Sequence, residues 1–499
     1  MQSPSPIRAY PSHTVLRTLT VLVFLSPVVA YLACAIQRMD SPVLLEWMEA
    51  GSLQMMQQVL SGKPLYAAPS VEFVPYTYTP LYFYLSALLS GVVGSGLFPL
   101  RLLSFVASLV SFLLLFTIVR RETASSRGGM AAVGLFAGSY AVNGNWFDIA
   151  RIDSLCIALL LAGVTLGLGE ARSRNLIAGG LLVAFAFFTK QVALVIAAPL
   201  MLAVGIRHGK IGGLFALSAL GTIVVGSLAW NVLSAGWFLF YVLESPGARW
   251  RGNLSLGSLT QATLYEFLPL FIVSIAVALP TIASQLRRPR RREMSFLLVV
   301  SGLFLAAAWG RVESINFLNS SIPAHLGVAF LLGIGVGKLL NDSNHFRTNL
   351  AILGAFILQL SIFTMMLGPL RPTEQENANY SRYSSFIHSL PKPMYIPDQG
   401  FVPTLGSDNS FAHSIGIMDL MMGGSPAVVE EFRRKMTEAL NARRFKTIVC
   451  DTPLFERWFK EELHRNYELS PLEATNTTWT PVLGFQNRPR IFTPRKDVQ

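Results

Sequence analysis

The chain has 499 residues, of which 52% are hydrophobic and only 14% are charged. Its mean hydropathy of +0.47 is too high for a soluble globular protein, which needs more polar surface. The formal charge of +12 does not indicate nucleic-acid binding, because the excess Lys and Arg residues stand in short clusters between apolar stretches. The composition therefore excludes the soluble classes and predicts an integral membrane protein that binds no nucleic acid.

Eleven apolar stretches recur up to residue 368 and approach the ~20 residues that a helix needs to cross ~30 Å of hydrocarbon. They are continuously apolar and do not alternate with period two, which favours helices over a β-barrel. The predicted fold class is an α-helical polytopic membrane protein. The predicted spans are residues 15–36, 99–119, 129–145, 153–169, 175–190, 192–206, 211–234, 263–286, 294–309, 322–340 and 350–368.

The orientation follows from five basic loops, which all fall on one side if the N-terminus is cytoplasmic. These loops contain Arg120, Arg121 and Arg127; Arg172 and Arg174; Arg207 and Lys210; Arg287 to Arg292; and Lys338 and Arg347. We therefore expect a plasma (inner) membrane protein with its C-terminus outside. This count requires residues 76–93 to lie along the outer surface as an interfacial helix. The alternative, a twelfth span, would place the later basic loops outside.

Carboxylates gather in the first two predicted outer loops, residues 37–98 and 146–153. Glu46 and Glu49 are three residues apart, so that a helix would place both on one face. Asp148 and Asp153 flank Arg151 just before an apolar span. Acids gathered at one face of a membrane would suit sugar transfer from a polyprenyl phosphate, because this reaction needs a carboxylate that removes the acceptor's proton. We expect Glu49 as this base, with Asp153 in support and Glu46 and Asp148 as further catalytic candidates. The alternatives are an amphipathic outer helix and a helix cap at Asp153.

Isolated cations at the outer boundary are candidates for binding the phosphate of the donor, which leaves with negative charge. The candidates are Arg151, Lys190 and Arg311. Lys190 could instead extend to lipid headgroups, and Arg311 could pair with Glu313. Arg101 stands at the start of an apolar helix and is expected only to mark that boundary. No His, Asp and Glu cluster with metal-ligand spacing stands in an outer loop, so the sequence leaves a divalent metal open but gives it no support.

The order of these motifs resembles the GT-C class of polyprenyl-phosphate-sugar glycosyltransferases, in particular its bacterial protein-mannosyltransferase-like and aminoarabinose-transferase-like branch. The resemblance covers about residues 15–340. It rests on Gly62-Lys-Pro-Leu-Tyr66, Tyr78-Thr-Pro-Leu-Tyr82, Arg151-Ile-Asp153, Thr189-Lys-Gln191 and Glu313-Ser-Ile-Asn-Phe317. It implies an acid of the first outer loop as general base, support from an acid of the second, and inversion at the anomeric carbon. In the first loop this chain reads Glu49-Ala-Gly51 and lacks the adjacent acids of many members.

The composition becomes polar from about residue 371, so we expect residues 1–370 to form the membrane module and 371–499 a small extracytoplasmic α/β domain. Residues 445–451 predict a buried strand, and 428–441 and 453–466 predict helices. Such a domain could recognise the acceptor or cover the membrane site.

The expected partners are a polyprenyl-phosphate-linked sugar, a lipid, glycan or protein acceptor, and membrane lipids. Two other functions fit the composition: a secondary transporter or lipid flippase, and a membrane scaffold that presents its tail. Transporters usually contain internal repeats and ionisable groups near mid-membrane, whereas the acids here lie in outer loops. A scaffold would leave the outer ions without a role.

Overall fold

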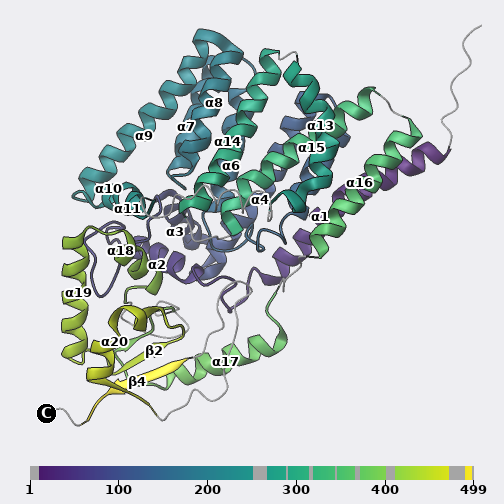
Figure 1. Ribbon diagram of the computed structural model, residues 1–499. Helices are drawn as coiled ribbons and strands as arrows, with labels where there is room; N and C mark the ends of the chain where they lie inside the picture. The colour runs from purple at the N-terminus through teal and green to yellow at the C-terminus, as the bar shows by residue number, and fades with distance from the viewer. Residues whose placement is uncertain are drawn as a thin grey trace, which may run out of the picture.

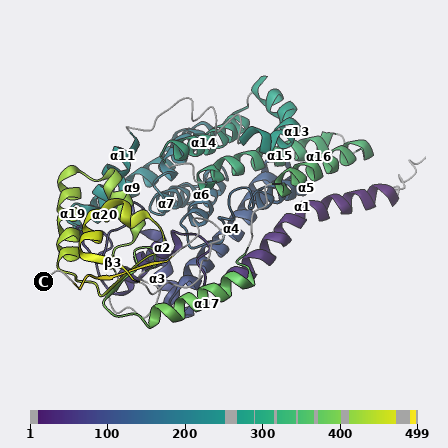
Figure 2. The same ribbon diagram turned by 60° about the horizontal axis from the view of Figure 1, so that its bottom comes forward.

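The computed structural model describes residues 11–250, 267–287, 290–313, 318–342, 345–365, 371–399, 411–470 and 489–496. A bundle of helices forms one part of the molecule, and a smaller tail with a sheet lies against the side where α2 (Glu49–Leu60) and α3 (Leu81–Val93) are found (Figures 1 and 2). The first predicted outer loop, which contains α2 and α3, therefore lies on the side of the bundle that faces the tail (Figures 1 and 2).

Each of the eleven predicted apolar stretches overlaps a helix of the bundle. These helices are α1 (Pro11–Arg38), α4 (Leu97–Thr123), α5 (Ser126–Gly138), α6 (Asp153–Gly167), α7 (Ser173–Phe187), α8 (Ala193–His208), α9 (Gly213–Leu233), α13 (Leu268–Arg287), α14 (Arg291–Glu313), α15 (Ile322–Asp342) and α16 (Phe346–Thr364). Short helical turns link some of them: η1 (Gly209–Gly212), α10 (Trp237–Leu239), η2 (Phe240–Glu244), α11 (Ser245–Trp250) and η4 (Leu318–Ser321).

Among the described residues, six helical stretches are long and apolar enough to cross a membrane. They are Thr14–Arg38, Leu97–Thr123, Ala193–Leu233, Arg291–Arg311, Leu318–Asn341 and Phe346–Thr364. The chain is therefore an integral membrane protein by this measure, whereas eleven crossings stay a prediction. Helices α5, α6 and α7 have only 13, 15 and 15 residues. The stretch 129–145 yields a short helix because the chain turns after Gly138, with positive φ at Gly144 and Asn145.

Close contact between helices is made by small residues, as is common in membrane proteins. Helix α5 packs against α15, and a Cβ atom on Gly128 would lie 2.6 Å from the carbonyl oxygen of Gly333. A Cβ atom on Gly333 would lie 2.8 Å from the carbonyl oxygen of Gly128. Larger side chains at these two positions would push the helices apart.

Helix α3 is the segment predicted to lie at the interface. It has 13 residues and is thus about 20 Å long, which is shorter than the hydrocarbon layer. It packs against α2 and α4, and it exposes Leu88 and Val92 on its other face. Its length favours an interfacial helix over a twelfth span, although its depth in the membrane stays a prediction.

The tail contains a four-stranded mixed sheet in the order β1-β2-β4-β3. Strands β1 and β2 are parallel, and the pairs β2–β4 and β3–β4 are antiparallel. The predicted strand 445–451 corresponds to β2, and the predicted helices correspond to α19 and α20. The tail's elements are α17 (Glu374–His388), β1 (Met394–Tyr395), α18 (Ser414–Gly423), α19 (Pro426–Asn441), β2 (Thr447–Cys450), α20 (Leu454–Asn466), β3 (Tyr467–Leu469) and β4 (Arg490–Pro494).

Helix α18 joins the tail to the first outer loop. Just before it, the Ala412 amide donates to the carbonyl of Val71 at 2.9 Å. Two of its glycines lie close to backbone outside the tail. An added Cβ atom at Gly416 would lie 2.6 Å from the oxygen of Val74 in the first predicted outer loop, and one at Gly423 would lie 2.3 Å from the oxygen of Ser245 in α11. The segment is therefore packed into the bundle and is not a solvated arm.

Candidate functional site

A cavity lies where the outer loops, the helix ends and α18 meet. Its empty space is about 1350 Å³, including the part open to solvent. One part of its wall is apolar and comes from α6, the start of α8, α14 and α15, with Cys156, Ile157, Leu160, Val192, Ile196, Ala306, Ile322 and Pro323. Another part is polar and carries Thr77, Tyr78, Arg151, Asp153, Lys190, Gln191, Asn319, Ser320 and Asp419. A ligand with an apolar chain and a charged head fits such a wall.

Asp153 and Lys190 form an ion pair in the polar wall. The Lys190 Nζ atom lies 2.6 Å from Oδ1 of Asp153. The Trp146 indole donates to Oδ2 at 3.0 Å, and the Asn319 amide lies 3.3 Å from Oδ1. Asp153 is the first residue of α6, and Lys190 follows the end of α7, so two helix ends place this pair. Both predicted residues therefore reach the cavity together.

Arg151 is held between aromatic rings beside this pair. Its guanidinium carbon lies 5.3 Å from the ring centre of Tyr78 and 5.5 Å from that of Trp146. Its Nη2 atom donates to the Tyr78 hydroxyl at 2.8 Å. The buried Nε and Nη1 atoms make no hydrogen bond within the described part of the chain. Two donor atoms of this fixed cation therefore lack a hydrogen-bond acceptor among the described residues, and Nη1 lies 3.7 Å from Glu46.

Glu46 lies behind Arg151. Its Oε2 atom is 3.7 Å from Nη1 of Arg151 and accepts a hydrogen bond from the Met48 amide at 3.0 Å. Its Oε1 atom is buried without a hydrogen bond in the described part of the molecule. Burial raises the pKa of Glu46 to about 8, although Arg151 acts in the opposite direction. Glu46 does not line the cavity itself, whereas its neighbours Trp47 and Met48 do.

Glu49 forms a closed ion pair with Arg101, and neither side chain is exposed. Arg101 donates from Nε at 2.9 Å and from Nη2 at 2.6 Å. The amides of Leu45 and Ala150 donate to the same carboxylate at 2.7 and 2.8 Å. Burial alone would raise the pKa of Glu49, but Arg101 and these hydrogen bonds hold it below its usual value.

Glu49 is not among the residues that line the cavity, so this geometry favours a structural role over the expected role as base. Arg101 was expected only to mark the start of an apolar helix, but it has a further structural role. Arg101 is fully buried and also donates to the carbonyls of Ser41 and Val43, so it fixes the first outer loop.

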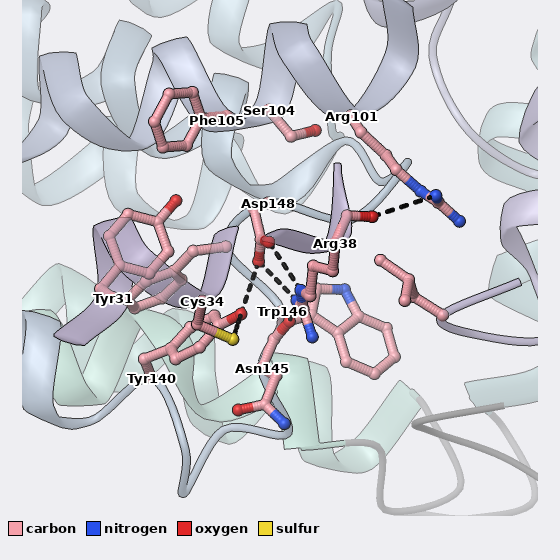
Figure 3. A network of polar contacts seen from close by, with 12 residues as sticks. Tyr31, Cys34, Arg38, Arg101, Ser104, Phe105, Tyr140, Asn145, Trp146 and Asp148 are labelled. Carbon is pink, nitrogen blue, oxygen red and sulfur yellow. Dashed lines mark hydrogen bonds and ion pairs between the residues drawn. The ribbon is translucent and has the colours of Figure 1, made fainter. Parts of the chain in front are cut away.

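Asp148 forms a second closed pair, with Arg38 (Figure 3). Arg38 donates to Oδ2 at 2.7 Å and to Oδ1 at 2.5 Å, and the Tyr140 hydroxyl donates to Oδ1 at 2.8 Å. Arg38 is the last residue of α1, so the pair attaches the first helix to the second outer loop. Asp148 does not line the cavity, and its contacts favour a structural role over catalysis.

Arg311 lies near the cavity but does not line it, although its neighbour Gly310 does. Its Nε and Nη2 atoms lie 3.2 and 3.0 Å from the hydroxyl of Ser321. The motif residues 314–317 lie outside the described residues, as does the side chain of Glu313. The predicted phosphate contact of Arg311 therefore stays a prediction.

Asp419 on α18 was not expected at the site. It is 6% exposed, lines the cavity and accepts a hydrogen bond from the Thr77 hydroxyl at 3.2 Å. Met418 and Met422 line the cavity from the same helix. The signal in the sequence was weak: Ser414 to Gly423 is an apolar stretch inside a polar tail, with one acid in it. Among the described residues, no group of three or more His, Cys, Asp or Glu could hold a metal ion.

Comparisons with known proteins agree with this architecture. Residues 77–230 match the family described as dolichyl-phosphate-mannose-protein mannosyltransferase. No curated protein sequence matches the chain significantly.

Two similar solved structures are of ArnT from Cupriavidus metallidurans. The one bound to undecaprenyl phosphate has a TM-score of 0.55 and 11% identity, covering 97% of this chain and 98% of ArnT. The apo structure has a TM-score of 0.55 and 12% identity, covering 93% and 97%.

AglB from Archaeoglobus fulgidus, an archaeal oligosaccharyltransferase in complex with an inhibitory peptide and a dolichol-phosphate, has a TM-score of 0.50 and 13% identity. That match covers 92% of this chain and 73% of AglB. At these identities the structural likeness establishes the fold. Together, the family model and the fold confirm the resemblance to the GT-C class of polyprenyl-phosphate-sugar glycosyltransferases.

Proposed function

We propose that the chain is a membrane glycosyltransferase that moves a sugar from a polyprenyl-phosphate donor to an extracytoplasmic acceptor, with inversion and a carboxylate base. The observation that carries this proposal is a cavity that combines an apolar wall with two cations, Arg151 and Lys190, and two carboxylates, Asp153 and Asp419. The apolar wall suits the start of an isoprenoid chain. Arg151 and Lys190 suit the phosphate, and the ArnT and AglB structures contain lipid phosphates of this kind.

The leaving group of this reaction is a polyprenyl phosphate, which gains negative charge as the glycosidic bond breaks. Arg151 has two buried donors without hydrogen bonds among the described residues, and its position is fixed by two aromatic rings. A cation that is already oriented stabilises the developing charge without reorganisation. Lys190, 20% exposed, supplies a second charge next to it.

The base in this proposal is Asp153, because it alone of the four candidate acids lines the cavity. Its pairing with Lys190 loosens when the donor phosphate also binds that lysine, so that the carboxylate becomes available to the acceptor's proton. Glu46 is the second candidate, with one oxygen that lacks a hydrogen bond in the described part of the structure. Glu49 and Asp148 then act as positioning residues for the two outer loops.

The test uses the purified full chain in nanodiscs with undecaprenyl phosphate, the carrier without its sugar, as the binding probe. Binding is followed by the fluorescence of the cavity tryptophans Trp47 and Trp146, and by consumption of a panel of radiolabelled undecaprenyl-phosphate sugars in native membranes. We expect saturable binding that a neutral polyprenol does not reproduce, and loss of sugar from at least one donor. A transporter or flippase would move the lipid without consuming it.

The membrane orientation is part of the proposal and has its own test. We expect Ser381 on α17 to be outside and Ser173 at the start of α7 to be cytoplasmic; both are exposed. Cysteines placed at the two positions should therefore react oppositely with an impermeant maleimide added to intact cells. Labelling of Ser173→Cys, but not of Ser381→Cys, would reverse the orientation.

A further inference from the structure

A cluster of charges lies at the ends of four bundle helices that carry the predicted cytoplasmic loops. Its centre is Glu122 on α4, whose side chain is only 6% exposed. Arg121 lies 3.6 Å from its carboxylate, Arg207 of α8 lies 3.4 Å from it and Arg292 of α14 lies 2.7 Å from it. Arg121 also donates to the carbonyl of Thr165 on α6 at 2.8 Å. One acid thus holds three guanidinium groups from three helices.

The charges in this cluster do not balance. Three guanidinium groups and one carboxylate leave two positive charges uncompensated. The other acids described at this end have partners of their own: Glu170 pairs with Arg172 at 2.7 Å, and Glu293 with Lys338 at 3.4 Å. The preference for positive charge in cytoplasmic loops explains why arginines occur here, but not why they are drawn together around one buried acid.

Several donors in the cluster are also unsatisfied. Nε and Nη2 of Arg121 and Nη1 of Arg207 are buried and make no hydrogen bond to the described residues. A shielded donor without an acceptor is costly, so native structures usually supply one. Arg292 donates to Glu122 and to the carbonyl of Arg121, and its side chain is 51% exposed, so the cluster borders the surface there. An anion with several oxygens would satisfy both the charge and the donors.

The surroundings favour a lipid over a soluble anion. The helices that supply the arginines expose large apolar residues along their length: Leu113 on α4, Leu202 on α8 and Leu305 on α14. These residues suit contact with acyl chains, and basic pockets between helices on the cytoplasmic side are typical headgroup sites. We propose that Glu122, Arg121, Arg207 and Arg292 form a binding site for the phosphate headgroup of an anionic phospholipid. This site does not depend on the proposed enzymatic activity.

The experiment compares lipids that differ only in headgroup. Native mass spectrometry of the full chain should count bound phosphatidylglycerol and phosphatidylcholine with identical acyl chains. We expect phosphatidylglycerol to bind preferentially, and Arg207→Gln to weaken this binding about 10- to 150-fold, since one charge-assisted contact is lost. Arg172→Gln is the matched control, because it removes a charge from an exposed pair at the same end, and it should bind like the wild type.

The source of the phosphate is tested with inorganic phosphate and glycerol phosphate at millimolar concentration. Neither should displace the lipid or raise the unfolding temperature as phosphatidylglycerol does. Displacement by either would make the site one for a soluble anion and overturn the lipid proposal. Equal binding of both lipids by the wild type, or unchanged selectivity in Arg207→Gln, would also overturn it. If Arg207→Gln does not fold, Arg292→Gln replaces it, because that side chain is half exposed.

Discussion

Two groups of buried charges in the outer loops use the same residue types for different purposes. In the closed group, Glu49–Arg101 and Asp148–Arg38, every carboxylate oxygen accepts hydrogen bonds and none of the four residues lines the cavity. In the open group, Arg151, Asp153 and Lys190 line the cavity, and two donor atoms of Arg151 make no hydrogen bond to the described residues. On the proposed function, saturation by partners, rather than the presence of an acid beside an arginine, distinguishes a structural pair from a reactive one.

The largest effect is expected at Asp153. Asp153→Asn keeps the shape and removes the basicity, so turnover of the polyprenyl-phosphate sugar should fall ~10²- to 10⁴-fold. Binding of undecaprenyl phosphate should change little, because Arg151 and Lys190 remain. Asp40→Asn, which changes an exposed acid of the first outer loop, is the control. A loss of less than twofold in folded Asp153→Asn protein would move the base to Glu46.

Glu49→Gln should affect stability rather than chemistry. It leaves Arg101 buried without its counter-charge, and breaking a buried pair in this way costs about 3–5 kcal/mol of unfolding free energy. Thermal unfolding in detergent measures this, with Glu46→Gln as the matched control, since Glu46 has fewer hydrogen bonds. A Glu49→Gln protein with unchanged unfolding temperature and abolished turnover would restore Glu49 as the catalytic base.

Arg151→Gln and Lys190→Gln should mainly weaken binding of the lipid phosphate. Loss of one charge-assisted contact corresponds to about 1.5–3 kcal/mol, or roughly 10- to 150-fold in affinity for undecaprenyl phosphate. Lys63→Gln, an exposed cation of the same outer region, should bind like the wild type. Unchanged affinity in both cavity variants would mean that Arg151 and Lys190 have a structural role, like Arg101 and Arg38 in the closed group.

The last effect is on the pH dependence of stability and concerns buried acids that have no ion-pair partner among the described residues, Asp398 and Asp451 in the tail. Burial and the neighbouring Asp398 raise the pKa of Asp451 from 3.8 to about 8. The folded state therefore keeps a proton that the unfolded state releases, so stability should fall as the pH rises from about 4 to 8 and then level off. The protection of β2 amides against hydrogen exchange, corrected for the intrinsic exchange rate at each pH, should be greater at pH 6 than at pH 8.5.

Asp451→Asn should reduce this pH dependence, because the side chain no longer titrates. Exchange rates in α16, which belongs to the bundle, provide the internal reference for the intrinsic effect of pH. An unchanged pH dependence in Asp451→Asn would show that the carboxyl at 451 is not the titrating group.

Much of the fold could be predicted because a bilayer imposes a simple pattern. The eleven apolar stretches each overlap a helix, and the strand 445–451 and the helices 428–441 and 453–466 correspond to β2, α19 and α20. The lengths of the helices were harder to predict. The stretch predicted for α5 continued to residue 145, but the chain turns after Gly138. An apolar composition does not reveal that the chain turns back toward the site.

Part of the candidate site could also be predicted from the sequence, since the predicted residues Arg151, Asp153 and Lys190 line one cavity. The sequence could not separate Glu49 from Asp153, because their difference lies in partners that are distant along the chain. Arg101 is 52 residues from Glu49, and Arg38 is 110 residues from Asp148. Asp419 was not predicted as a site residue for the same reason, because its partner Thr77 is 342 residues away.

Helix α18, which supplies part of the cavity wall, is synthesised late in the chain. Its residues Met418, Asp419 and Met422 close the cavity, whereas Arg151 and Lys190 are made more than two hundred residues earlier. While the ribosome is still producing the tail, the membrane helices can already be inserted, but the pocket lacks one wall. The wall of the cavity that α18 supplies is therefore completed only after the tail has been synthesised.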